Sequence, residues 1–166
     1  KRADWMPSHI RWMRRFFSRE LLPLLSPVGL DPAHPFPKLL NKSLNFLVTL
    51  EGTDAFGRPN GTAIVQVPRS LPRVIHLPVR NAAWPHDFAF LSSVMHAFVH
   101  QLFPGMHVTG CYQFRVTRNS NLFVDEEDVD DLRRALEGQL PERRFGDEVR
   151  LEVADNCPPD LVYFLR

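Results

Sequence analysis

The stretch LNFLVTLE at residues 44–51 and the stretch TAIVQV at residues 62–67 decide the fold. Both are short and rich in β-branched or aromatic side chains, which favour extended strands. The residues between them include glycine, proline and asparagine, which supply tight turns. These turn-forming residues are Gly52, Gly57, Pro59, Asn60 and Gly61. The two stretches therefore predict an antiparallel β-hairpin.

Further strand patterns follow the hairpin along the chain. Residues 106–118 alternate, which predicts a strand with an apolar and a polar face. The apolar face holds Val108, Tyr112, Phe114 and Val116, and the polar face holds Thr109, Gln113, Arg115 and Thr117. Residues 147–154 alternate again, residues 122–124 form a possible short strand, and residues 73–77 lie between prolines that favour an edge or short strand.

The segments between and around these strands carry apolar residues at helical spacing. Residues 8–22 carry apolar side chains three or four positions apart, with Ser8 as N-cap, so the N-terminal segment 1–25 is expected to form an amphipathic helix. A buried helix is expected from Asp87 to Phe103, and another from Asp125. Pro158 and Pro159 indicate that residues 156–166 start a C-terminal helix.

The order of these elements predicts one domain of the α/β or α+β class. Helices alternate with strands, so we expect a mixed β-sheet with packed helices and, because a hairpin is included, mixed strand directions. A chain of 166 residues with 44% hydrophobic content can build one core. Because it begins at Lys1 and ends within a pattern at Arg166, we expect it to be a fragment of a longer chain.

Composition excludes several classes of protein. The formal net charge of +1 gives no bulk attraction to nucleic acid or to an anionic membrane. No apolar run approaches the ~20 residues that span a bilayer. Two cysteines, Cys111 and Cys157, are too few for a disulfide framework and are interpreted as free thiols. These features predict a cytoplasmic domain.

Histidines and acids offer weak signals for metal chemistry. His96 and His100 have the spacing of two metal ligands on one helix, but no acidic general base stands beside His96, so we interpret them as a helix-surface pair. His34 and His76 are interpreted as structural braces. The acids between Asp125 and Asp131 are interpreted as a solvated helix start, whose dipole favours negative charge. We predict neither a metal site nor a catalytic residue.

Arginines are the remaining candidates, because guanidinium groups bind phosphate oxygens in pairs. Arg115 and Arg118 lie on the predicted strand 106–118, where alternation places them on opposite faces. Arg69, Arg73 and the arginines of the first helix are further candidates for an anion or an acidic neighbouring domain. The latter are Arg11, Arg14, Arg15 and Arg19. Solvated or interdomain salt bridges are the alternative explanation for each group.

Several motifs resemble one family in the same order along the chain. They are DPAHPFP (31–37), NKSLNF (41–46), VP (67–68), LPR (71–73), LFPGM (102–106), FRVTRN (114–119) and the acidic helix start at Asp125. Together they resemble the middle, or head, domain of the polyphosphate kinases, which build polyphosphate from ATP. The resemblance covers roughly residues 10–165, and departs most at 52–61 and 79–87.

The resemblance implies a four-part parent enzyme that uses ATP and magnesium. In such a parent the head domain supports subunit association, and two C-terminal domains hold the phosphorylated histidine. This segment would then be a structural and assembly module, inactive alone, whose partners are the other domains of its chain and further copies of the parent. The implied fold has helices on both faces of the sheet, like the three-layer small histidine-phosphatase fold.

No catalytic residue or cofactor is carried over to this segment. Arg69, Arg73, Arg115 and Arg118 remain candidates for contact with polyphosphate or with another domain. The alternative function is a nonenzymatic anion or nucleic-acid binder. An RNA-binding sheet would need outward aromatic side chains, whereas Phe46, Tyr112 and Phe114 fit core positions equally well.

Overall fold

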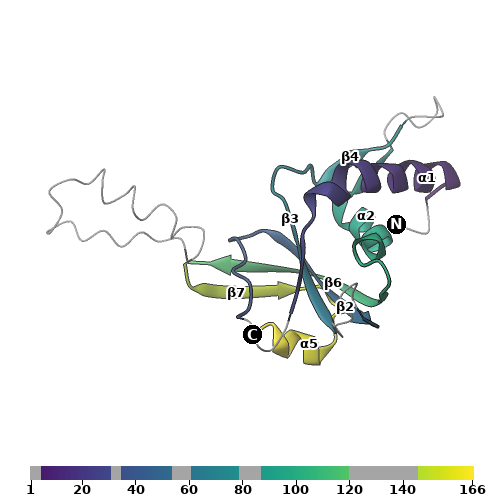
Figure 1. The fold of residues 1–166 in the computed structure, drawn as a ribbon. Coiled ribbons are helices and arrows are strands. Elements are labelled where there is room, and N and C mark those ends of the chain that lie inside the picture. Colours follow the sequence, from purple (N-terminus) through teal and green to yellow (C-terminus); the bar gives the residue numbers. More distant parts are fainter. Residues whose placement is uncertain (1–4, 31–34, 54–60, 79–86, 120–145) are drawn as a thin grey trace, which may run out of the picture.

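A five-stranded sheet with helices on both faces forms the body of the molecule (Figure 1). The computed structural model describes residues 5–30, 35–53, 61–78, 87–119 and 146–166. Helices α1 (Pro7–Phe16) and α2 (Leu91–Phe98) lie above the sheet in Figure 1, and α5 (Pro159–Phe164) lies below it. This arrangement confirms the α/β class and the placement of helices on both faces. The likeness to the histidine-phosphatase fold stays a prediction.

The strand order of the sheet is β1-β3-β2-β6-β7. These strands are β1 (Pro27–Gly29), β2 (Leu44–Glu51), β3 (Thr62–Val67), β6 (His107–Arg118) and β7 (Glu148–Val153). The β2–β3 hairpin is confirmed, with Phe46 opposite Val65. Every pairing between the described strands is antiparallel, so the mixed directions that we expected do not occur among them. Strand β1 was not anticipated, because it is only three residues long and begins with a proline.

Two apolar cores lie on opposite faces of the sheet. One joins α1 and α2 to the sheet and includes Met13, Phe46 and Val65. The other includes Leu47 and Phe114 and packs against α5 and the residues around it. Because successive strand residues point to opposite faces, β2 supplies both cores, which explains its nearly continuous apolar sequence.

The N-terminal helical segment departs from a regular α-helix after Phe16. Its α-helical part begins at Pro7, with Met6 rather than Ser8 as N-cap and without a side-chain cap. Proline suits the first helical position because that position needs no intrahelical N–H donor. A π-helical turn (Phe17–Leu21) and a 3-10 turn (Leu22–Leu24) then carry the chain to the sheet.

The helix expected from Asp87 to Phe103 begins later than predicted. Phe88–Phe90 form strand β5, which pairs with β4 (Val74–His76) in a separate two-stranded sheet. Ala89 enters the core while its two phenylalanine neighbours face solvent, a strand alternation that helical spacing concealed. Helix α2 therefore starts at Leu91 and ends in a 3-10 turn (Val99–Leu102). The short strand expected within residues 73–77 is confirmed.

A β-bulge in β6 corrects the predicted faces of that strand. Thr49 pairs with Gly110 while Leu50 pairs with Val108, so Thr109 is the extra residue. An extra residue reverses the alternation. Val108 consequently packs toward α1 and α2, whereas Phe114 belongs to the opposite core.

The C-terminal part follows the sequence expectations where it is described. Strand β7 confirms the strand expected in residues 147–154, and α5 confirms the helix start within 156–166. The alternation of β7 is not reflected in its burial, because Val149 is 63% exposed. The strand expected at residues 122–124, and the helix expected from Asp125, lie outside the described residues. No helix in the described part of the chain is long and apolar enough to cross a membrane.

Candidate functional site

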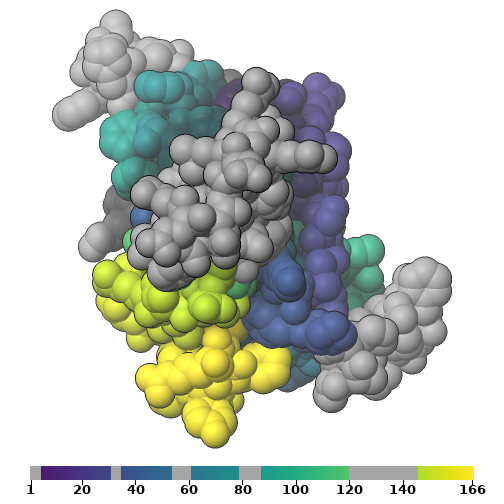
Figure 2. Space-filling view, turned by 90° about the vertical axis from the view of Figure 1, so that its left-hand side faces the viewer, coloured from purple at the N-terminus to yellow at the C-terminus, as the bar shows by residue number. Residues whose placement is uncertain are grey.

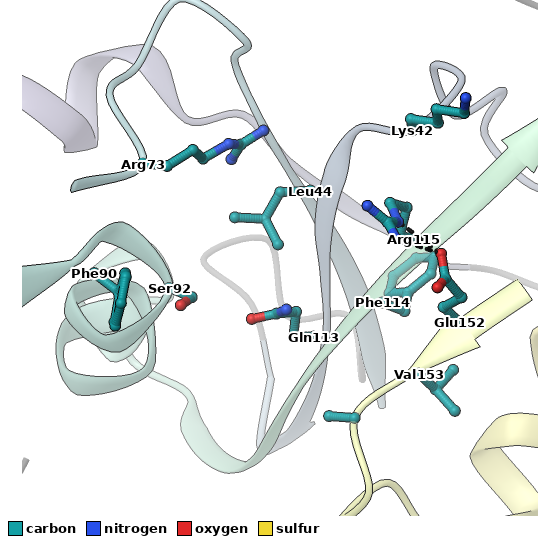
Figure 3. A pocket seen from close by; sticks show the side chains of 11 residues that line it. Lys42, Leu44, Arg73, Phe90, Ser92, Gln113, Phe114, Arg115, Glu152 and Val153 are labelled. Carbon is teal, nitrogen blue, oxygen red and sulfur yellow. Dashed lines mark hydrogen bonds and ion pairs between the residues drawn. The ribbon is translucent and has the colours of Figure 1, made fainter. Parts of the chain in front are cut away.

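A cationic hollow of about 460 Å³ opens between the start of α2 and the β6–β7 part of the sheet (Figure 3). Its lining carries three cationic side chains, from Lys42, Arg73 and Arg115, and one carboxylate, from Glu152. Leu44, Phe90, Ser92, Gln113, Phe114, Val153 and Ala154 complete the lining. The structure thus brings together two of the four predicted arginines, Arg73 and Arg115, which lie far apart in the sequence.

One side of the cationic hollow is built by the segment before β4 and by α2. The backbone carbonyl of Arg73 accepts a hydrogen bond from the amide of Leu91 at 2.9 Å, which fixes Arg73 beside the start of the helix. Phe90, the N-cap of α2, makes no side-chain cap hydrogen bond. In Figure 3 the guanidinium of Arg73 extends into the hollow, and Ser92 points toward Gln113 on the other side.

The other side is built by β6 and β7, where three charged residues share contacts. Nε and Nη2 of Arg115 lie 2.7 and 2.6 Å from the same oxygen, Oε2 of Glu152. The second oxygen of Glu152 lies 3.2 Å from Nη2 of Arg150. Arg115 and Arg150 are both exposed, so neither ion pair is locked by burial.

Arg118 is kept out of the cationic hollow and braces the fold. Its buried guanidinium donates from Nε to the carbonyl of Leu39 and from Nη1 to the carbonyl of Gly146, both at 2.8 Å. Nη1 also lies 2.6 Å from the carboxylate of Glu148. The fourth candidate, Arg69, is exposed and does not line the hollow.

Two of the motifs that suggested the family contact each other in space. The side-chain oxygen of Asn41 accepts from the amide of Arg118 at 2.9 Å, and the amide of Lys42 donates to the carbonyl of Val116 at 2.8 Å. Asn45, fully buried, donates to the carbonyl of Ser43. The residues NKSLNF and FRVTRN therefore tie strands β2 and β6 together, and only Lys42, Leu44, Phe114 and Arg115 of these motifs line the hollow.

The histidine candidates lie in different surroundings. His96 packs edge-on against Phe46, with ring centroids 5.2 Å apart, while His100 lies exposed in the 3-10 turn after α2. His76 is exposed on β4, and His34 and the acids 125–131 lie outside the described residues. Among the described residues, no three histidine, cysteine or acidic side chains are grouped to hold a metal ion.

His9 is a buried histidine that the sequence pattern did not single out. His9 lies on the buried face of α1, and its Nε2 lies 3.4 Å from Oδ2 of Asp87 without forming a hydrogen bond to a described residue. Asp87, where the helix 87–103 was expected to begin, faces this histidine instead. The sequence also did not single out Lys42, Ser92 and Gln113 as site residues, although Lys42 lies in a quoted motif. These residues come together only in the tertiary fold, which places the start of α2 opposite β6.

Neither cysteine forms a disulfide, in agreement with the sequence interpretation. Burial raises the pKa of the Cys111 thiol from 9.0 to about 12. Burial first, and then the nearby carboxylate of Asp160, raise the pKa of Cys157. Both thiols consequently stay protonated near neutral pH, which makes them poor nucleophiles.

The aromatic side chains do not form a nucleic-acid platform on the sheet. Phe46 and Phe114 are buried, one in each core, and Tyr112 is only partly exposed. An RNA-binding sheet would present such rings outward for base stacking. The structure therefore favours the core interpretation of Phe46 and Phe114, while Tyr112 belongs to neither core.

Comparisons with known proteins agree with the motifs. Residues 8–166 match the family model described as "Polyphosphate kinase middle domain". Polyphosphate kinases of Neisseria meningitidis serogroup C and Neisseria gonorrhoeae are each 59% identical over 165 residues, and that of Pseudomonas aeruginosa is 56% identical. Each alignment covers 99% of this chain but only 24% of the relative.

A comparison of folds also matches nearly all of this chain to a small part of a longer protein. A crystal structure of polyphosphate kinase from Porphyromonas gingivalis matches with a TM-score of 0.71 and 22% identity. It covers 96% of this chain and 22% of that chain, which supports the likeness of fold. Because the family model matches nearly the whole sequence, the chain belongs to the polyphosphate kinase middle-domain family.

Proposed function

We propose that this chain is a structural and assembly module of a polyphosphate kinase, the enzyme that reversibly transfers the terminal phosphate of ATP to polyphosphate. The chain spans about a quarter of the length of the relatives it matches, so the reaction itself is assigned to other parts of the parent. ATP and magnesium are bound there, and the phosphorylated histidine belongs there. The parent acts as a homo-oligomer in the cytoplasm, where the two unpaired cysteines stay reduced.

The observation that carries this proposal is an apolar surface around α5. Tyr163 and Phe164 of that helix are 79% and 51% exposed, and Phe36, 43% exposed, meets Phe164 edge-on at 6.3 Å. Figure 2 shows α5 (yellow) standing out from the surface beside β7. Clustered exposed aromatic side chains mark protein contacts, because leaving them in water is unfavourable. Another domain of the same chain is the proposed occupant.

The first test asks whether the segment acts alone. The purified 166-residue chain is incubated with ATP and magnesium, and product is measured as acid-insoluble polyphosphate. We expect none, with the intact parent enzyme as positive control. Synthesis of polyphosphate by this segment would overturn its assignment as an assembly module.

The second test addresses the surface around α5 in the intact enzyme. Tyr163→Ser and Phe164→Ser should weaken the association of α5 with the neighbouring domain, measured as faster limited proteolysis of the intact enzyme, and lower polyphosphate synthesis. Leu24→Ser is the matched control, because Leu24 is 52% exposed on another part of the surface. Unchanged association in the α5 variants, or an equal loss in the control, would contradict the proposed contact.

A further inference from the structure

The cationic hollow carries more positive than negative charge, and part of that charge has no partner within the described part of the chain. Arg73 and Lys42 are not paired with an acid among the described residues, and Glu152 is the only carboxylate in the lining. Charges gathered in a concave site raise the local concentration of anions. The near-neutral balance of the whole chain therefore conceals one locally cationic place.

The start of α2 adds fixed dipoles to the same hollow. The first amide of the helix, on Leu91, is satisfied by the carbonyl of Arg73, but the N-cap residue Phe90 supplies no side-chain acceptor for the amides that follow. Uncapped first-turn amides carry partial positive charge and bind anions. Ser92, in this first turn, lines the hollow on the helix side (Figure 3).

Arg115 lies on the opposite side of the hollow, and its guanidinium can leave Glu152 to bind an anion. It contacts a single oxygen of Glu152, and the other oxygen of that carboxylate is held by Arg150. If Arg115 turns into the hollow, Arg150 still neutralises Glu152. Because Arg115 is half exposed, its ion pair is weak enough to be exchanged for a bound anion.

We propose that the cationic hollow is a binding site for a phosphoryl oxyanion. Arg73 and the first turn of α2 bind it from one side, and Arg115, released from Glu152, binds it from the other. A phosphoryl group presents acceptor oxygens in several directions, which suits donors from opposite sides and from two forked guanidinium groups. Lys42 lies at the rim and in Figure 3 extends away from the centre, so it contributes long-range attraction rather than a direct contact.

Two sources of phosphoryl group fit this chemistry, an inorganic phosphate chain and a nucleotide. The hollow lies between α2 and the sheet, whereas the surface around α5 lies on the opposite face, so this site does not depend on the proposed assembly role. Phe90, 55% exposed at the edge of the hollow, could stack on a nucleotide base. Comparing inorganic tripolyphosphate with ATP distinguishes the two sources.

The test is a calorimetric titration of the 166-residue chain with inorganic tripolyphosphate at fixed low salt, repeated with ATP and with citrate as a carboxylate control. Arg73→Gln should weaken tripolyphosphate binding about tenfold, as expected for one charge-assisted contact. Lys42→Asn should weaken it about two- to threefold. Arg69→Gln, an exposed arginine outside the hollow, is the matched control and should change nothing.

The exchange of Arg115 has its own variant. Glu152→Gln should tighten tripolyphosphate binding severalfold, because Arg115 is then free and the only carboxylate of the lining is gone. Amide resonances of Ser92 and Gln113 should shift on binding in each binding-competent variant. Tighter binding of ATP, lost in Phe90→Ser, would identify the nucleotide as the ligand.

Several outcomes would overturn the proposal. Citrate binding as tight as tripolyphosphate would remove the phosphoryl preference, and an equal loss in Arg69→Gln would show nonspecific attraction. Undetectable tripolyphosphate binding by a chain with a dispersed, folded spectrum would exclude the site. Weaker binding in Glu152→Gln would refute the release of Arg115.

Discussion

Arg118 and Glu148 lie 2.6 Å apart, yet the two side chains have opposite surroundings: that of Arg118 is 7% exposed and that of Glu148 is 62% exposed. The arginine is held by the carbonyls of Leu39 and Gly146, which belong to segments that are distant in sequence. Burial, rather than the ion pair, therefore decides how much each residue contributes to stability.

Arg118→Met should lower the free energy of unfolding by about 2–4 kcal/mol, because the buried carbonyl of Leu39 and the partly buried carbonyl of Gly146 lose their donors. Glu148→Gln should cost less than about 1 kcal/mol, since an exposed ion pair contributes little. Urea denaturation followed by fluorescence measures both. Similar costs for the two variants would contradict this division of roles.

The backbone conformation of Lys42, two residues before β2, can be tested by substitution. Its φ of 56° lies in the left-handed region, which a β-branched residue adopts only at a cost. Lys42→Val should therefore destabilise the fold by about 1–3 kcal/mol, while Lys42→Asn should be nearly neutral because asparagine tolerates this conformation. Thermal melts compare the two. A neutral valine variant would show that the turn rearranges.

The sequence predicted those elements whose side-chain pattern matches their surroundings. Strands β2 and β3 are apolar and separated by turn residues, and their burial follows from that pattern. Strand β7 was predicted from alternation, but its burial increases along the strand instead and Val149 is 63% exposed. Strand β5 was missed because Phe88 continues the helical spacing of Leu91 and Val94, whereas pairing with β4 makes residues 88–90 a strand that leaves Phe88 and Phe90 exposed. The bulge at Thr109 was missed because it is a property of the pair of strands.

The candidate site likewise depends on tertiary contacts that the local sequence pattern does not encode. Sequence could select Arg73, Arg115 and Arg118 as anion-binding residues, but it could not separate the two that line the hollow from the one that is buried. Alternation did place Arg115 and Arg118 on opposite faces. The deciding contacts of Arg118 come from Leu39 and Gly146, and no local pattern encodes contacts across such separations.

Gly110 marks a close approach inside the sheet. A methyl group on it would lie 2.5 Å from the hydroxyl oxygen of Tyr112 and 2.6 Å from Oγ1 of Thr49. Gly110→Ala should destabilise the fold by about 1–3 kcal/mol through overpacking beside the bulge. Gly61→Ala is the matched control, because nothing lies within 4 Å of its added methyl group. Equal midpoints in urea would show that Tyr112 moves aside without cost.

Cys111 should react slowly while the chain is folded. With its pKa raised to about 12, the thiolate is scarce at pH 8.5, and reaction with a disulfide reagent should be about a hundredfold or more slower than in the unfolded chain. A Cys157→Ser variant isolates this thiol. Rapid labelling in native buffer would show that Cys111 is not buried as described.

The same shift of the Cys111 pKa makes stability depend on pH. Below pH 9.0, the ordinary pKa, the thiol is protonated in both states and the folded chain has its full stability. Between about 9 and 12 only the unfolded chain releases this proton, so each pH unit should remove about 1.4 kcal/mol of the free energy of unfolding. Other groups titrate in this range, so Cys111→Ala is the reference. Urea midpoints measured from pH 8 to 10.5 should fall more steeply for the unmodified 166-residue chain than for Cys111→Ala. Parallel slopes would contradict the raised pKa of Cys111.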